Sequence, residues 1–233
     1  MKRILLALAV LSASTLAQNA QQPTPPPYCK PCLFYGGDFD PSNPNSNTLG
    51  NSFTDRYQAA TYVPFYVPSG ITWTIGGVFS NNMSTISFLD PPKVRWSISS
   101  GISMGDPGTV IASGENSATW TPTGRAWGNG FFTEYTALAK LMPEQFVTLT
   151  TGVYWLTVVP VCTGADCGDN RFYLSDVEDV PAPNHKGIEP NDDSYFVLAP
   201  LYLFAPAWGS SGVCEGGCDK FSAGLLGYAK PSN

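Results

Sequence analysis

Histidine is almost absent from this chain of 233 residues, which contains only His185. A serine hydrolase needs a histidine base, and transition-metal sites usually combine several imidazole or thiolate ligands. Residues 101–105 (Gly-Ile-Ser-Met-Gly) do match the nucleophile-elbow pattern G-x-S-x-G. However, Asp-Pro-Gly follows at 106–108, so no helix receives the turn that would expose the serine. We interpret the segment as a glycine turn between strands, and His185 as a residue of a proline-rich surface loop.

Basic residues are also scarce. The chain has 12 Lys and Arg against 18 Asp and Glu, which gives a net charge of −6. Loss of Lys2 and Arg3 with the signal peptide predicted below would leave 10 basic and 18 acidic residues, a net charge of −8. An acidic surface repels phosphate groups, so we exclude nucleic acid and anionic membrane surfaces as partners.

Long hydrophobic runs are missing beyond the first residues. The longest later one, 195–207, is interrupted by Pro200 and Pro206 and is shorter than the ~20 residues of a membrane-spanning helix. We therefore expect no membrane partner and no transmembrane segment in the mature protein.

The first 17 residues have the pattern of a secretory signal peptide. Two basic residues precede an apolar run over 4–11, and a small-residue segment ends at Ala17. We expect residues 1–17 to be removed and the protein to be secreted, either extracellular or periplasmic. Such a compartment is oxidising, which favours disulfide bonds.

The rest of the chain is typical of short strands separated by turns. Residues 18–33 form a proline-rich leader, and we expect a single domain over 34–233. Only 134–142 has a pattern that fits two helical turns. Apolar–polar alternation, with 23 Gly and 21 Pro as turn formers, predicts an all-β, antiparallel sandwich or jelly roll of about ten strands. The predicted strands are 61–67, 71–79, 84–88, 93–99, 109–113, 117–121, 131–137, 145–150, 153–161, 171–175 and 194–204.

The sequence also predicts where some of these strands lie in the sheet. Pro64 cannot donate to a ladder, which indicates that 61–67 is an edge strand. Residues 153–161 are hydrophobic on both faces, which indicates a central strand. Trp73, Trp96 and Trp155 have apolar partners at a spacing of two and are predicted core residues.

Three of the predicted strand segments resemble a sequence pattern found in other proteins. Residues 62–82, which include Val-Pro-Ser-Gly-Ile-Thr-Trp-Thr-Ile-Gly-Gly-Val-Phe-Ser-Asn-Asn, resemble a recurring pattern in secreted bacterial β-sandwich proteins. The strand of Trp96 leading to 108–111 (Gly-Thr-Val-Ile), and 152–156 (Gly-Val-Tyr-Trp-Leu), fit the same pattern. Many such proteins carry C-terminal sorting or anchoring signals, which we do not expect in this chain. The resemblance spans about 53–227 and implies a β-sandwich fold and an exported protein; it implies no site residue.

The even number of cysteines predicts disulfides in an oxidising compartment. Local pairing is feasible at 162/167 and 214/218, where Gly and Asp lie between the partners, whereas 29 and 32 could pair together or reach another element. A redox pair or a zinc site is the alternative, although neither the spacing nor the context of these residues is typical of one. The cysteines are Cys29, Cys32, Cys162, Cys167, Cys214 and Cys218.

A loop near the start of the domain is rich in oxygen ligands. Asp38, Asp40, Asn43 and Asn45 supply the carboxylates and amides that Ca²⁺ prefers, so a calcium site is predicted there. The spacing is not that of an EF-hand, because Leu49 occupies the position of the bidentate acid. The alternative is that these side chains form turns by bonding their own backbone.

Two tryptophans lie in segments that are rich in glycine. Trp127 follows Arg125 and precedes Asn129, in what reads as a flexible loop over 123–130, and Trp208 has a similar setting. Such residues can offer flat rings and amides to a sugar, so Arg125, Trp127, Asn129 and Trp208 are the predicted ligand-binding residues. A lid over the end of the domain, or a subunit contact, is the alternative.

These features favour a secreted, non-catalytic binding or surface-structural module that recognises an extracellular polysaccharide or surface protein. One alternative is a glycan hydrolase, which needs two facing carboxylates; Glu115, Glu134 and Glu144 are scattered in the sequence. Another is an envelope or matrix assembly protein that pairs through the predicted edge strand at 62–67. No catalytic residue is assigned.

Overall fold

The computed structural model describes residues 32–41, 48–54, 58–84, 93–163, 172–175, 177, 186–187, 194–199, 205–206 and 220–232. Several predictions fall outside these residues: the signal peptide, nearly all of the leader, most of the strand at 84–88, His185, Asn43, Asn45, Trp208 and the cysteines at 29, 167, 214 and 218.

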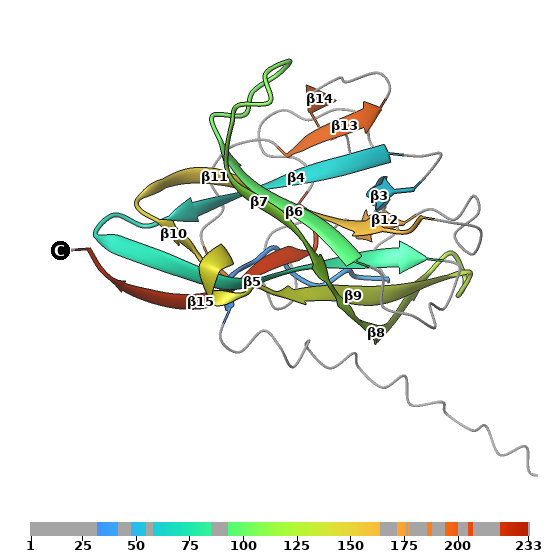
Figure 1. Cartoon of the computed structure of the whole chain (residues 1–233). Coiled ribbons are helices and arrows are strands. Elements are labelled where there is room, and N and C mark those ends of the chain that lie inside the picture. The colour runs from blue at the N-terminus through green and yellow to red at the C-terminus, as the bar shows by residue number, and fades with distance from the viewer. Residues whose placement is uncertain are drawn as a thin grey trace, which may run out of the picture.

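The described part of the chain is all-β, as predicted, with one 3-10 turn at Pro143–Gln145 and no α-helix (Figure 1). Its strands form two sheets in which every pairing but one is antiparallel. The strands are β1 (Cys32–Tyr35), β2 (Thr48–Gly50), β3 (Ser52–Phe53), β4 (Gln58–Val67), β5 (Ile71–Ser84), β6 (Lys93–Ser100), β7 (Thr109–Ser117), β8 (Thr119–Trp127), β9 (Phe132–Lys140), β10 (Val147–Leu149), β11 (Gly152–Val161), β12 (Tyr173–Ser175), β13 (Tyr195–Ala199), β14 (Ala205–Pro206) and β15 (Ala223–Pro231).

The eight-stranded sheet is organised around β5, the longest strand. One edge of β5 pairs with β15 and then β12, and the other pairs with β10 and then β9. The sheet continues through β1 beyond β15, β2 beyond β12 and β8 beyond β9. Because both edges of β5 are paired and most of its residues are buried, this strand connects all other members of the sheet.

The seven-stranded sheet has the order β14-β13-β4-β3-β11-β6-β7. Its β11 pairs with β4 and β3 on one side and with β6 on the other, and seven consecutive residues from Trp155 to Val161 are buried. The prediction of a central strand at 153–161 is therefore confirmed.

The prediction of an edge strand at 61–67 is confirmed only for the half of β4 that contains Pro64. Its first half, 58–62, pairs with β13, and its second half, 63–67, pairs with β11. Pro64 lies in the second half, where β13 no longer pairs, so its missing N–H removes no bond on that side. Within the described residues, 63–67 therefore pair with β11 alone, and the assembly hypothesis stays a prediction.

The segment 134–142, whose pattern fits two helical turns, forms part of β9 up to Lys140 instead. Residues 132–140 pair with β5 on one side and β8 on the other, and the strand predicted at 131–137 is confirmed. Two polar residues of β9, Glu134 and Thr136, are fully buried against partners on other strands. Tertiary contacts thus override the local pattern.

One buried cluster receives side chains from both sheets. Phe65 on β4 is fully buried and lies 6.0 Å from the ring of Trp73 on β5, with the two rings nearly parallel. Trp96 belongs to the same cluster, which confirms two predicted core tryptophans. Trp155 is also buried, but it packs against Ile102 in a separate cluster, on the opposite face of β11 from Leu156.

Glycine at position 224 is required by close packing between strands. A Cβ there would lie 2.4 Å from Phe79 Cζ and 2.7 Å from the Phe34 carbonyl oxygen. We expect Gly224→Ala to lower the free energy of unfolding by about 1–3 kcal/mol, because overpacking displaces backbone and core side chains.

Gly76→Ala is the matched control, measured with Gly224→Ala by urea unfolding. Its Cβ would meet only the ring of Phe146, which is 44% exposed and can move, so we expect a change within about 0.5 kcal/mol. Equal effects at the two positions would contradict the packing described for β15.

Candidate functional site

Trp127 and Asn129 lie at the tip of the β8–β9 hairpin. The strand β8 extends to Trp127, so the predicted flexible loop over 123–130 is wrong for its first five residues. The turn is closed by a hydrogen bond from the Phe131 N–H to the Gly128 carbonyl oxygen, at 3.1 Å. Asn129 (φ 57°) and Gly130 (φ 86°) both adopt the left-handed conformation that Asn-Gly favours in tight hairpins.

Four aromatic residues gather at this tip, and we call them the hairpin-tip cluster. The ring of Phe132 lies 5.4 Å from Trp127, 5.0 Å from Phe131 and 5.9 Å from Tyr173, measured between centroids. Phe131 is 69% exposed, whereas the other three rings are half-buried. The cluster therefore presents aromatic surface to solvent beside the exposed amide of Asn129.

Arg125, the third predicted binding residue, is not at the surface. The β8–β9 register shifts between Pro122 and Ala126, and Arg125 lies within this irregularity, which changes the direction of its side chain. Its side chain is fully buried, with Nε 2.5 Å from Glu134 Oε2 and Nη1 3.0 Å from Asp38 Oδ1. Arg125 therefore connects the hairpin to the interior instead of contacting a ligand.

Further buried groups extend this ion-pair group. The Tyr35 hydroxyl donates to Asp38 Oδ1 at 2.5 Å, and Asn81 Nδ2 donates to the Tyr35 oxygen at 2.9 Å and to Ser222 Oγ at 2.7 Å. Thr136 Oγ1 donates to Asn81 Oδ1 at 2.6 Å. These contacts join β1, β5, β9 and Ser222, the residue before β15, to the base of the hairpin.

Burial and charge act together in this group. Burial is the main cause that raises the pKa of Tyr35 well above 10.0, and the neighbouring Asp38 carboxylate adds to it. Burial opposes the charged form of Arg125, but Glu134, Tyr35 and Asp38 together raise its pKa. Arg125 therefore stays protonated, and Tyr35 stays neutral and able to donate its hydrogen bond to Asp38.

The residues of the predicted calcium site have different environments. The carboxylate of Asp38 is buried against Arg125 and Tyr35, whereas Asp40 is half-buried. Asn43 and Asn45 lie outside the described residues. Within the described ranges, no group of three or more His, Cys, Asp or Glu residues could hold a metal ion.

The three glutamates considered for hydrolysis also differ in environment. Glu134 is fully buried against Arg125, Glu115 accepts hydrogen bonds from Arg95 and Lys93, and Glu144 is exposed in the 3-10 turn.

The G-x-S-x-G segment at 101–105 is a turn between β6 and β7, as predicted. Ser103 and Asp106 exchange two backbone hydrogen bonds there, at 2.9 and 3.1 Å.

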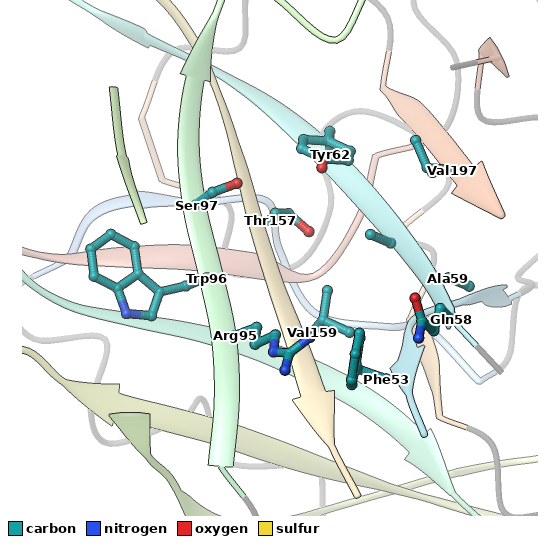
Figure 2. Close-up of a pocket in the computed structure, with 11 residues that line it drawn as sticks. Phe53, Gln58, Ala59, Tyr62, Arg95, Trp96, Ser97, Thr157, Val159 and Val197 are labelled. Atoms are coloured by element: carbon teal, nitrogen blue, oxygen red, sulfur yellow. The ribbon is translucent and has the colours of Figure 1, made fainter. Parts of the chain in front are cut away.

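A pocket lies on the face of the seven-stranded sheet that points away from the shared core; we call it the sheet-face pocket (Figure 2). Its volume is about 300 Å³. Four of its residues form two neighbouring cross-strand pairs. Ser97 and Arg95 on β6 pair with Thr157 and Val159 on β11, respectively. Tyr62 on β4 lies on the same face.

Arg95 is held in place at this pocket. Its Cζ atom lies 3.5 Å from the centroid of the Phe53 ring, a cation–π arrangement, and its Nε donates to Glu115 Oε2 at 2.8 Å. The Arg95 hydrogen bond lowers the pKa of Glu115, so this carboxyl is ionised at neutral pH. Burial raises the pKa of Tyr62, which keeps its hydroxyl neutral.

None of the sequence patterns described above predicts the sheet-face pocket. Alternation along β6 and β11 could have placed Arg95, Ser97, Thr157 and Val159 on the outer faces of their strands. The pairing of the two strands, about 60 residues apart, carries no local signal, so their meeting could not be predicted.

In comparisons with known proteins, no family model matches this chain and no curated protein matches it. No helix in the described part of the chain is long and apolar enough to cross a membrane.

Neither of the described cysteines, Cys32 and Cys162, is a free thiol. The predicted pairing stays a prediction, because the other four cysteines lie outside the described residues.

Removal of the Arg125 charge should destabilise the protein strongly. We expect Arg125→Met to lower the free energy of unfolding by about 3–5 kcal/mol, because Asp38 and Glu134 would remain buried without a cation. In Arg95→Met, the matched control, the lost ion pair is half-exposed and the cost should be below about 1 kcal/mol. Urea unfolding measures both; similar losses would contradict the assigned role of Arg125.

Tyr35 should make stability depend on alkaline pH. Its raised folded-state pKa contributes stability that is complete below pH 10 and is lost as the pH rises through the folded value. Tyr35→Phe should therefore show a smaller loss of stability between about pH 9 and 11, measured by urea unfolding. Tyr228→Phe, at a 58% exposed tyrosine, should retain the wild-type slope; equal slopes in all three proteins would refute the prediction.

Proposed function

We propose that this protein is a secreted, non-catalytic module that binds a neutral extracellular glycan through the hairpin-tip cluster. The observation that carries the proposal is the exposure of Phe131 beside Trp127 on a hairpin whose base is fixed by buried ion pairs. Exposed aromatic residues that gather at one place commonly mark an interaction site.

The hairpin has the rigidity that a binding surface needs. Arg125 lies two residues before Trp127, and Glu134 lies two residues after Phe132 on the paired strand. Their ion pair therefore closes the hairpin directly below the cluster. A surface held in one arrangement before binding loses less conformational entropy when a ligand arrives.

The chemistry of the tip suits an uncharged sugar. The sequence from 127 to 132 is Trp-Gly-Asn-Gly-Phe-Phe and contains no ionisable side chain. Aromatic rings can contact the apolar C–H face of a pyranose, and the exposed amide of Asn129 has both a donor and an acceptor for hydroxyl groups. Trp208, the remaining predicted binding residue, lies outside the described residues.

The architecture that we propose for this module is a disulfide-stabilised β-sandwich of the jelly-roll type. Two mainly antiparallel sheets that share one buried cluster support it, as does the absence of a free thiol at Cys32 and Cys162. The signal-peptide pattern of residues 1–17 supports export to an extracellular or periplasmic location.

Affinity electrophoresis through gels that contain neutral polysaccharides tests the proposal. The purified protein should be retarded by at least one neutral polysaccharide in the panel, and Trp127→Ala or Phe131→Ala should reduce that retardation by about tenfold or more. Tyr228→Ala is the matched control, because Tyr228 is an exposed aromatic residue on β15, away from the tip.

Thermal unfolding of each variant establishes that the fold is retained. No retardation of the wild-type protein across the panel, or equal retardation of the wild type and both tip variants, would overturn the proposed function.

A further inference from the structure

We propose that the sheet-face pocket is a second binding site, and that it takes a single sugar acid, a pyranose that bears a carboxylate. The site is separate from the hairpin-tip cluster: its residues lie on β3, β4, β6, β11 and β13, whereas the cluster lies on β8, β9, the turn between them and β12. The inference therefore does not rest on the proposed function.

Arg95 supplies the group that recognises the carboxylate. Its Nε is engaged by Glu115 and its plane is held over the Phe53 ring, so the orientation of the guanidinium is fixed. Its two terminal nitrogens make no hydrogen bond to any described residue. They form a planar pair of donors, which matches the two oxygens of a carboxylate.

The charge balance around the pocket favours an anion. Lys93 and Arg95 share the single ionised carboxylate of Glu115, so the three groups carry a net charge of +1. No acidic side chain among the described residues lines the pocket itself. A bound carboxylate would neutralise the remaining positive charge.

The floor of the pocket has hydroxyl groups that fit the rest of a sugar. Ser97 and Thr157 are direct cross-strand partners on the outer face, so their side chains lie next to each other. The Thr157 residue is only 6% exposed, and its Oγ1 has no hydrogen-bond partner in the described part of the chain. A buried hydroxyl without a partner is costly, and a ligand hydroxyl would remove that cost.

The size and the apolar walls limit the ligand to a small one. A volume of about 300 Å³ is at the lower end of the range for ligand pockets, which suits one ring better than a chain. Val159, Val197 and the ring of Phe53 line the pocket beside the polar groups. A pyranose combines apolar C–H faces with hydroxyl groups, as this lining requires.

Isothermal titration calorimetry with sodium D-glucuronate tests the inference. The wild-type protein should bind D-glucuronate saturably and at least about tenfold more tightly than D-glucose, which lacks the carboxylate. Arg95→Met should weaken D-glucuronate binding by about ten- to hundredfold, because a charge-assisted pair of hydrogen bonds is lost. Arg95→Lys should restore only part of the affinity, since lysine cannot supply the planar pair of donors.

Lys230→Met is the matched control, because Lys230 is an exposed cation on β15 that neither lines the pocket nor pairs with Glu115. It should retain the wild-type affinity within about threefold, and so should Trp127→Ala. Absence of D-glucuronate binding, or equal binding to Arg95→Met with its thermal unfolding unchanged, would overturn the inference. Benzoate binding as tightly as D-glucuronate would overturn the assignment to a sugar.

Discussion

The ion pairs of Arg125 connect the parts of this structure that the sequence keeps apart. One guanidinium, with no exposed surface, contacts the carboxylates of Asp38 and Glu134. Removing three charged groups from water is expensive, and their mutual attraction offsets this cost only in one arrangement. We therefore infer that the group determines where the β8–β9 hairpin packs more than it adds to overall stability. Tyr35 and Asn81 extend this constraint to β1 and β5.

The two proposed binding surfaces depend differently on this constraint. The hairpin-tip cluster lies directly above the Arg125–Glu134 pair, so its geometry follows from the buried charges. The sheet-face pocket depends instead on the register of β6 and β11, which places Ser97 beside Thr157. The first surface is uncharged and aromatic, whereas the second carries a net positive charge through Arg95. Two surfaces of such different chemistry suit ligands of different charge.

The predictable parts of the fold were those encoded by local hydrophobic patterns. Residues 153–161 are apolar on both faces and form the central β11, and Trp73 and Trp96 are core residues as expected. The inward direction of the Arg125 side chain was not predictable, because it depends on a shift in the β8–β9 register that the local sequence does not specify. The burial of Glu134 was not predictable either, since its partner Arg125 is on another strand. The sheet-face pocket was not predictable either, because it depends on the pairing of β6 with β11, which are far apart in the sequence.

Hydrogen–deuterium exchange of the β8–β9 amides tests most directly whether the buried charges fix the hairpin. Amides at the base of the hairpin, next to Arg125 and Glu134, should exchange as slowly as those of the central strand β5, because opening them would break the ion pairs. In Arg125→Met these amides should exchange faster while the amides of β11 change less. Exchange at the hairpin base as fast as in the exposed turn at 103–106 of the wild-type protein would contradict the account.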